Sequence, residues 1–165
     1  VSVLILGVVL IKNIFTSATN VVDLTNEQLT QEVNKLFSAE NEISIYPSTR
    51  LVEIKQEQKN GVGLGIKNLL EESSGNTVFS YEVTASDSAS LTKCGVTKEV
   101  AEDWIVTGRT GDDINIPSGG IYSGKILFYI PVGSPLCTLR YSVNVKADGK
   151  IYASSNFFDI SIKAK

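Results

Sequence analysis

The hydrophobic and polar residues divide the chain into three parts with different periodicities. The first fifteen residues, VSVLILGVVLIKNIF, are almost wholly apolar and contain one charged residue, Lys12. Farther along, apolar residues recur at helical spacing and form one stripe opposite a polar face. That stripe consists of Val22, Leu29, Val33, Leu36 and Phe37. From Ile43 onward, short runs of β-branched and aromatic residues alternate with turn residues, a pattern typical of an all-β domain.

The first two parts predict one continuous or gently kinked helix from about residue 1 to residue 38, about 57 Å long. No Pro or Gly interrupts this stretch after Gly7. An alternative is a break at Asp23–Leu24, because Thr25 and Gln28 have the spacing of a capping box that starts a second helix. A helix of the full length is much longer than the usual helix of a small domain, so we expect it to pack against other chains.

The third part predicts an immunoglobulin-like β-sandwich. The expected strands are Ile43–Tyr46, Leu51–Glu57, Val62–Leu70, Thr77–Ala85, Trp104–Thr107, Ser123–Pro131, Leu139–Lys146 and Ile151–Ile162. Asp148–Gly149 is a strong hairpin signal between the last two. The predicted fold class is therefore α+β: a long N-terminal hydrophobic helix within residues 1–42, followed by an all-β immunoglobulin-like sandwich over residues 43–165.

The start of the chain is unusual because Val1 is not a methionine and no methionine follows it. We expect that a leader has been cut off and the apolar segment kept, whereas a secretory signal peptide loses its apolar stretch. The alternative is a chain deliberately shortened at Val1. Residues 1–22 are long enough to span a bilayer as a helix of about 33 Å, but they include Lys12 and two asparagines, so insertion is marginal. This suits a segment that lodges in a membrane and later leaves it.

The charge distribution excludes some partners. Residues 1–42 carry two basic and five acidic residues, while residues 43–165 carry thirteen of each, for a total net charge of −3. There is no basic stripe for a nucleic-acid backbone, so we expect no nucleic-acid partner. The chain also has no histidine, which removes serine triads, cysteine–histidine dyads and most catalytic zinc sites. We therefore expect no enzymatic activity, no cofactor and no metal.

Two further patterns have competing interpretations. Gly61, Gly63 and Gly65 resemble a phosphate loop superficially, but they lead into a strand-like run with no helix N-terminus to hold a phosphate. The better interpretation is a strand whose glycines admit close packing by a neighbouring element. The acidic pairs Glu102–Asp103 and Asp112–Asp113 offer oxygen ligands for Ca²⁺, but they lack the EF-hand spacing and are more simply solvated loops.

The two cysteines, Cys94 and Cys137, are predicted to form a disulfide. Closing a loop of about 44 residues contributes on the order of 4 kcal/mol of stability in the chain-entropy estimate. The bridge is expected to hold the irregular stretch from Ser86 to Ala101 against the strand that begins near Cys137. The alternative is a pair of buried free thiols in a reducing compartment.

The order of these parts resembles the type IV pilin superfamily. A chain that begins directly with VSVLILGVVLIKNIF and ends in a disulfide-bearing β-domain is most similar to its archaeal branch, the archaeal pilins and archaellins. Bacterial pilins usually have Phe first and Glu fifth, where this chain has Val1 and Ile5. The resemblance implies that a dedicated peptidase removes a short leader, that the N-terminal helices bundle into a filament core, and that the β-domains form the outer sheath.

The resemblance also implies which residues build the filament core. The expected packing residues are Val1, Val3, Leu4, Ile5, Leu6, Val8, Val9, Leu10, Ile11, Ile14, Phe15, Val22, Leu29, Val33, Leu36 and Phe37. A buried Lys12 requires a partner, so we expect an ion pair with Asp23 or Glu27 of a neighbouring subunit. The alternative is that Lys12 extends toward a lipid headgroup.

Two functions remain open from the sequence. In the first, the protein is a structural subunit of an extracellular helical filament, a cell-surface appendage for adhesion or motility. Its partners are then copies of itself, and the membrane before assembly. In the second, it is a membrane-anchored surface protein with an immunoglobulin-like binding domain. An apolar stripe continuing through Val33, Leu36 and Phe37 favours the filament, because a simple anchor needs only one span and a linker.

Overall fold

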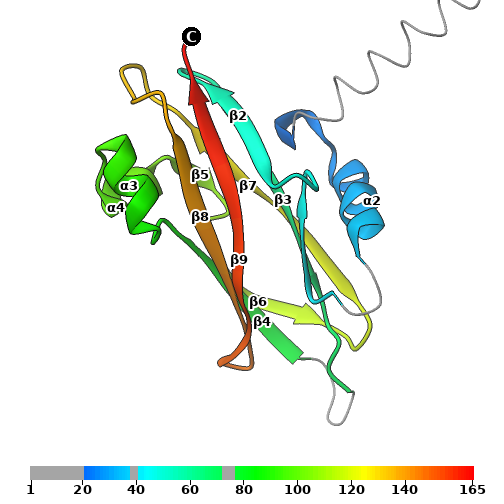
Figure 1. Cartoon of the computed structure of the whole chain (residues 1–165). Coiled ribbons are helices and arrows are strands. Elements are labelled where there is room, and N and C mark those ends of the chain that lie inside the picture. Colours follow the sequence, from blue (N-terminus) through cyan, green and yellow to red (C-terminus); the bar gives the residue numbers. More distant parts are fainter. Residues whose placement is uncertain (1–20, 38–40, 72–76) are drawn as a thin grey trace, which may run out of the picture.

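The computed structural model describes residues 21–37, 41–71 and 77–165, and in this part of the chain the fold is mostly β (Figure 1). Two sheets face each other across one core. The strands are β1 (Ile43–Tyr46), β2 (Leu51–Lys55), β3 (Lys59–Lys67), β4 (Thr77–Thr84), β5 (Ile105–Thr107), β6 (Thr110–Ile116), β7 (Ile121–Tyr129), β8 (Thr138–Ala147) and β9 (Lys150–Lys163). The helical elements are the 3-10 turn η1 (Val21–Asp23) and the helices α2 (Asn26–Leu36), α3 (Ser88–Cys94) and α4 (Lys98–Asp103).

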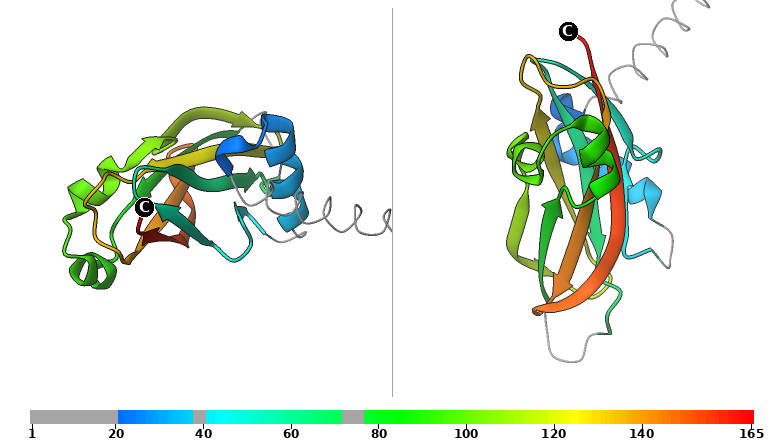
Figure 2. Two further views of the ribbon diagram at one scale, coloured as in Figure 1. Left: turned by 90° about the horizontal axis from the view of Figure 1, so that it is seen from above. Right: turned by 60° about the vertical axis from the view of Figure 1, so that its left-hand side comes forward.

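The two sheets differ in strand direction. The first sheet has the order β1-β3-β7-β5, and its neighbouring strands are antiparallel. The second has the order β2-β9-β8-β4-β6, in which β2 runs parallel to β9 while the other neighbours are antiparallel. Figures 1 and 2 place α2 on one side of the molecule and the α3–α4 pair on the other.

The core between the sheets is filled by alternate residues of each strand, because successive side chains of a strand point to opposite faces. Its centre is aromatic. The ring of Tyr141 in β8 lies edge-on to Phe128 of β7 with a centroid separation of 4.8 Å, and it stacks on Phe158 of β9 at 5.7 Å. All three side chains are fully buried.

The predicted fold class is wrong, and the N-terminal part shows why. The described residues contain no long apolar helix. Instead, η1 ends at Asp23, and Leu24 and Thr25 separate it from the short amphipathic helix α2. Thr25 caps α2 through the capping box with Gln28, so the alternative that placed a break at Asp23–Leu24 is confirmed. Residues 1–20 of the expected continuous helix lie outside the described residues.

The second half of the fold-class prediction, an immunoglobulin-like sandwich, is also wrong. The sheets are curled, the edge strand β2 of the second sheet pairs with β9 in parallel, and two helices are inserted between β4 and β5 (Figure 2). The pattern of alternation located most strands correctly but did not encode their order. The hairpin at Asp148–Gly149 is confirmed: both residues have positive φ, 50° and 81°, as the tight turn between β8 and β9 requires.

A buried carboxylate fixes the α3–α4 insertion to the second sheet. Glu102 is 5% exposed, and it accepts hydrogen bonds from the backbone N–H of Ala85 at 3.0 Å and from the guanidinium of Arg109 at 2.8 Å. Nearby, the hydroxyl of Tyr141 donates to the carbonyl oxygen of Ala101 at 2.8 Å. These hydrogen bonds connect the end of α4 to the core. They also give each of these buried polar groups a partner, as buried polar groups require.

Burial of the tyrosines predicts a loss of stability in alkaline solution. Burial raises the pKa of Tyr141, with a further contribution from Glu102, and burial followed by Tyr122 raises the pKa of Tyr81. Tyrosines of the unfolded chain ionise at about pH 10, before the buried tyrosines of the folded chain do. The free energy of unfolding is therefore unaffected below that pH and falls above it, because the unfolded state then holds fewer protons than the folded state. We expect Tyr141→Phe to reduce the slope of unfolding free energy against pH by up to about 1.4 kcal/mol per unit above pH 10.

Urea unfolding at a series of pH values measures this slope. The hydrogen bond to Ala101 is also lost in Tyr141→Phe, so data below pH 9 determine that pH-independent change separately. Equal slopes in the parent and the variant above pH 10 would show that Tyr141 does not cause the loss of stability in alkaline solution.

Candidate functional site

The described chain begins at a point where the backbone is held firmly by the β-domain. Val21 is fully buried, and its N–H donates to the side-chain oxygen of Asn60 in β3 at 3.2 Å. The ammonium group of Lys125 in β7 donates to the carbonyl oxygens of Val22, at 3.5 Å, and of Leu24. We call residues 21–24 with Asn60 and Lys125 the N-terminal attachment. No pattern in the sequence marked Asn60 or Lys125 for this role.

Immediately after this attachment, α2 lies on the outer face of the first sheet, on glycines of β3. A Cβ atom at Gly63 would lie 2.4 Å from the side chain of Leu29, and one at Gly65 would lie 2.2 Å from that of Val33. The helix can therefore approach the sheet only because these two positions lack side chains. This confirms the interpretation of the glycine run as a strand that admits a closely packed neighbour.

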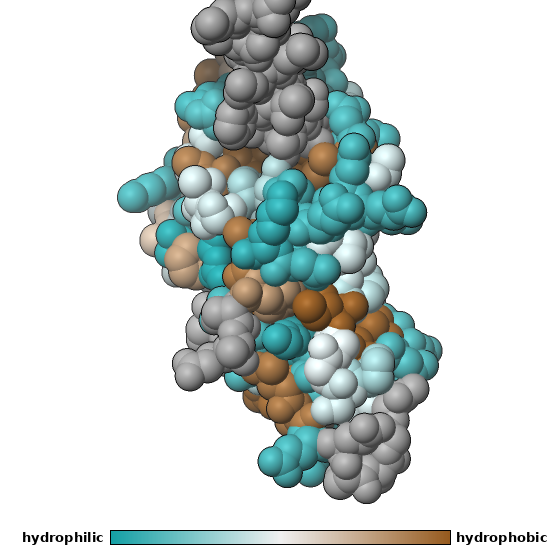
Figure 3. Space-filling model, turned by 90° about the vertical axis from the view of Figure 1, so that its right-hand side faces the viewer, coloured by the Kyte–Doolittle hydropathy of each residue, from teal (hydrophilic) through white to brown (hydrophobic). Residues whose placement is uncertain are grey.

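Polar contacts at the edges of this helix–sheet interface complete it. Thr30 of α2 and Ser123 of β7 share a hydrogen bond at 2.7 Å, and Ser44 of β1 donates to the carbonyl oxygen of Val33 at 3.4 Å. The opposite side of α2 is polar. Figure 3, which looks onto the α2 side of the molecule, shows hydrophilic residues across the upper middle of this face and hydrophobic patches below them. The helix is thus an integral part of the domain.

The structure accounts for the predicted apolar stripe within the chain itself. Leu29 and Val33 are 1% and 0% exposed in a small cluster with Val21, and Leu36 and Phe37 are packed against that cluster. Val22 of the same stripe is half-buried in η1. Since the two central residues have no surface left for a neighbouring subunit, the stripe does not distinguish a filament core from an anchor. The predicted packing residues from Val1 to Phe15 lie outside the described residues.

The structure describes only the acidic residues of the predicted ion pair. Asp23 and Glu27 are exposed, and neither forms an ion pair with another described residue. Their carboxylates are therefore accessible to a partner. Lys12 lies outside the described residues, so this pair stays a prediction.

The predicted disulfide is confirmed. Cys94 at the end of α3 is bonded to Cys137, which directly precedes β8, and their Cα atoms are 5.6 Å apart. The stretch it holds is helical rather than irregular: Asp87 caps α3 and Thr97 caps α4 through their side chains. These two N-caps were the available signals for the missed helices.

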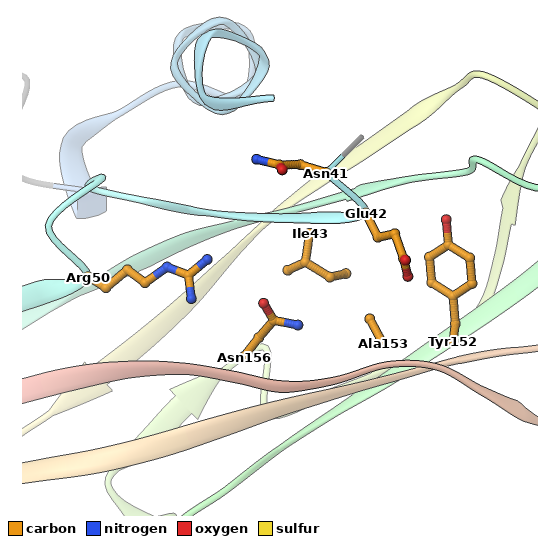
Figure 4. Close-up of a pocket in the computed structure, with 7 residues that line it drawn as sticks. All are labelled: Asn41, Glu42, Ile43, Arg50, Tyr152, Ala153 and Asn156. Carbon is orange, nitrogen blue, oxygen red and sulfur yellow. The ribbon is translucent and has the colours of Figure 1, made fainter. Parts of the chain in front are cut away.

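An open, polar hollow lies between β1, an edge strand of the first sheet, and the part of β9 that β2 does not pair with (Figure 4). Its volume is about 410 Å³, and Glu42, Arg50, Tyr152 and Asn156 line it. Burial raises the pKa of Tyr152, and Glu42 raises it further against the opposing effect of the Leu69 backbone. The hollow offers a carboxylate, a guanidinium and amide groups, which suits binding of a polar ligand and supplies no activated nucleophile.

The acidic pairs considered as calcium ligands are not assembled into a site. Glu102 is buried and bonded to Arg109 and Ala85, whereas Asp112 and Asp113 lie on the edge strand β6. Among the described residues, no group of three or more acidic or cysteine side chains is placed to hold a metal ion. In the same part of the chain, no helix is both long and apolar enough to cross a membrane.

No protein-family model matches the chain, and no curated protein matches it. Solved structures resemble it weakly, among them the following two. The alkylpurine DNA glycosylase AlkC of Pseudomonas fluorescens, bound to DNA containing an abasic site analog, is 12% identical with a TM-score of 0.37, over 73% of this chain and 30% of the glycosylase. A Niemann-Pick type C2 protein from Japanese carpenter ant is 14% identical with a TM-score of 0.34, over 74% and 90% of the two chains. Similarities this weak carry no argument about function.

The glycine face of β3 predicts that a side chain at Gly65 is destabilising. We expect Gly65→Val to lower the free energy of unfolding by about 1–3 kcal/mol, because the new side chain overlaps Val33 and Phe37. Glu53→Val, at an exposed position of β2, is the matched control and should change stability by no more than about 0.5 kcal/mol. Chemical unfolding followed by circular dichroism measures both variants, and equal effects would rule out close packing at Gly65.

The disulfide predicts a second stability difference. Replacing both cysteines, Cys94→Ala with Cys137→Ala, should lower the free energy of unfolding by about 4 kcal/mol because the unfolded chain regains the freedom of the closed loop. Alkylation of the unreduced parent protein followed by mass spectrometry is the control, and it should add no alkyl group. Two alkylated cysteines without reduction would show that the bridge does not form in solution.

Proposed function

We propose that this protein is a structural subunit of an extracellular helical filament, similar to an archaeal type IV pilus, that polymerises through its apolar N-terminal segment for adhesion or motility. The segment is residues 1–15. Its large aliphatic side chains aggregate in water unless lipid or other copies of the segment cover them. Heterologous contacts between copies that do not close into a ring generate helical filaments.

The N-terminal attachment is the observation that supports this proposal best. Only residues 16–20 separate the apolar segment from Val21, whose side chain is fully buried and whose backbone is held by Asn60. A membrane anchor works equally well through a flexible linker, whereas a filament needs every subunit to hold its domain in the same orientation. The firmly held backbone at Val21 meets the requirement of a filament, and it therefore favours the filament over the anchor.

The disulfide supports a location outside the cell. Disulfides form and persist in oxidising compartments and are rare in the cytosol, and Cys94–Cys137 connects two elements of the folded domain. With no histidine in the chain and a polar hollow that supplies no nucleophile, we assign the protein a structural role and no catalytic one.

A second candidate is a membrane-anchored surface protein whose β-domain binds a ligand. The hollow between β1 and β9 favours it, because Glu42 and Arg50 place opposite charges around one open space. In this function residues 1–15 stay in the membrane and the β-domain acts alone. The two candidates therefore differ in whether copies of the chain assemble.

Electron microscopy of the full chain distinguishes the two. We expect regular fibres when detergent is removed from the purified protein, because the apolar segments then cover one another. Leu6→Glu with Leu10→Glu should abolish the fibres, since a charge in a buried apolar segment is strongly unfavourable. Ile151→Glu, at a side chain that is 76% exposed, is the control and should leave them intact.

A dispersed monomer in light scattering, with residues 1–15 intact and no detergent, would overturn the filament. Flotation of the full chain with lipid vesicles, without fibres under any condition, would favour the anchored surface protein instead.

A further inference from the structure

Three segments that are distant in sequence meet at one end of the domain. The turn between β2 and β3 is bonded to the C-terminal residues, where the Gln56 N–H donates to the Lys163 carbonyl at 3.0 Å. The same turn contacts the connection between β7 and β8, where the Glu57 N–H donates to the Ile130 carbonyl at 2.6 Å. We call residues 55–59, 130–137 and 163–165 the loop end. Figure 1 shows it at the top of the molecule, opposite the β8–β9 hairpin.

The loop end holds two aliphatic side chains outward. Val132 and Leu136 are 68% and 61% exposed, whereas Ser134 between them is 9% exposed. The loop is nevertheless well braced: the Ser134 hydroxyl donates to the Pro131 carbonyl at 2.7 Å, and the Gln56 side chain donates to the Ser134 carbonyl at 2.6 Å. The disulfide at Cys137 fixes its far side. The loop end therefore presents two apolar side chains to solvent from a loop held by hydrogen bonds and a disulfide.

The loop end is also rich in lysine. Lys55, Lys59, Lys163 and Lys165 are exposed, and the one acidic side chain within the loop end, Glu57, is paired with Lys165. Four basic side chains against one acidic side chain contrast with the net charge of −3 of the whole chain. Asp23, which is also exposed, contributes an acidic group on the neighbouring α2 side.

We propose that the loop end is a contact surface for an anionic lipid bilayer, with Val132 and Leu136 entering the interface and the lysines facing the headgroups. Aliphatic residues flanked by lysines match such a surface, because apolar burial and attraction to anionic lipid act together. Protein–protein interfaces are instead depleted in lysine and enriched in arginine and aromatic residues. The inference does not rest on the proposed filament, because contact of the loop end with lipid requires no assembly of copies.

The N-terminal attachment agrees with this orientation. Val21 is bonded to Asn60, the residue after Lys59, so the chain that precedes Val21 joins the domain next to the loop end. An apolar segment lodged in a bilayer therefore brings this end of the domain, and not the β8–β9 hairpin, toward the lipid. The loop end adds a second, peripheral contact to the same membrane.

Tryptophan quenching tests the proposal. The full chain carrying Val132→Trp is bound to vesicles of phosphatidylcholine and phosphatidylglycerol in equal parts, with or without brominated acyl chains. We expect the fluorescence of the introduced tryptophan to fall in the brominated vesicles, after subtraction of the parent signal from the buried Trp104. Ile151→Trp, at the opposite end, is the matched control and should show no loss. Leu136→Trp provides a second variant in case the first does not fold.

A charge comparison tests the role of the lysines. Lys55→Gln with Lys59→Gln should lower the ratio of docked to undocked loop end about fivefold for each lysine, and the quenching should fall accordingly. Lys146→Gln with Lys150→Gln removes two exposed charges at or near the β8–β9 hairpin and should leave the quenching unchanged.

Three results would overturn the proposal: no quenching at position 132 in vesicle-bound protein, equal quenching at positions 132 and 151, or failure of the full chain to bind the vesicles. Protection of position 132 from a water-soluble quencher in lipid-free fibres, without quenching by brominated lipid, would also overturn it and assign the loop end to a contact between subunits. Fibre formation is scored separately by electron microscopy, so the two proposals fail independently.

Discussion

The two faces of strand β3 pack against different neighbours: one faces the core between the sheets, and the other lies under α2. The position of α2 and of residues 21–24 depends on this arrangement. Val62, Leu64 and Ile66 point into the core between the sheets, while Gly63 and Gly65 face outward and leave room for α2. Glycine weakens a strand interior. Here that weakness is offset by the burial of Leu29 and Val33, each of which contributes about 1.5–3 kcal/mol.

The same arrangement makes α2 and the N-terminal attachment one unit with the β-domain. Because α2 lies flat on the first sheet, the preceding residues are brought to Asn60 and Lys125, whose polar groups hold the backbone at residues 21–24. The point at which Val21 joins the domain is therefore set by the fold. That property links the structure to both proposals, since each requires a defined orientation of the domain toward what surrounds it.

The sequence predicted those features that depend on local pattern. Alternating apolar residues located most strands, Asp148–Gly149 located the last hairpin, and Cys94 and Cys137 are bonded as expected. The stripe of α2 was also recognised, but periodicity shows only that one face of a helix is covered and not by what. A stripe that packs on its own sheet and one that packs on another subunit have the same spacing.

Other features had weak or no local signals. The edge strand β6 was taken for solvated loop because Asp112 and Asp113 are uncommon in strands, although an edge strand leaves such residues in water. The two-turn helices α3 and α4 are too short to show a clear period, and only their caps marked them. The loop end and the polar hollow assemble from segments far apart in the chain, so no single stretch of sequence indicated either one.

The parallel pairing of β2 with β9 sets a condition on how the domain forms. Residues 51–55 acquire their neighbour only when residues 159–163 are available, and β9 also lies between β2 and β8 in the second sheet. Such long-range pairing is slow because a large loop must close first. During synthesis, the second sheet therefore remains unfinished until its last strand arrives. A chain that stopped near residue 150 would present the edges of β2 and β8 to other molecules, and it would be a substrate for chaperones and proteases rather than a shorter version of the same domain.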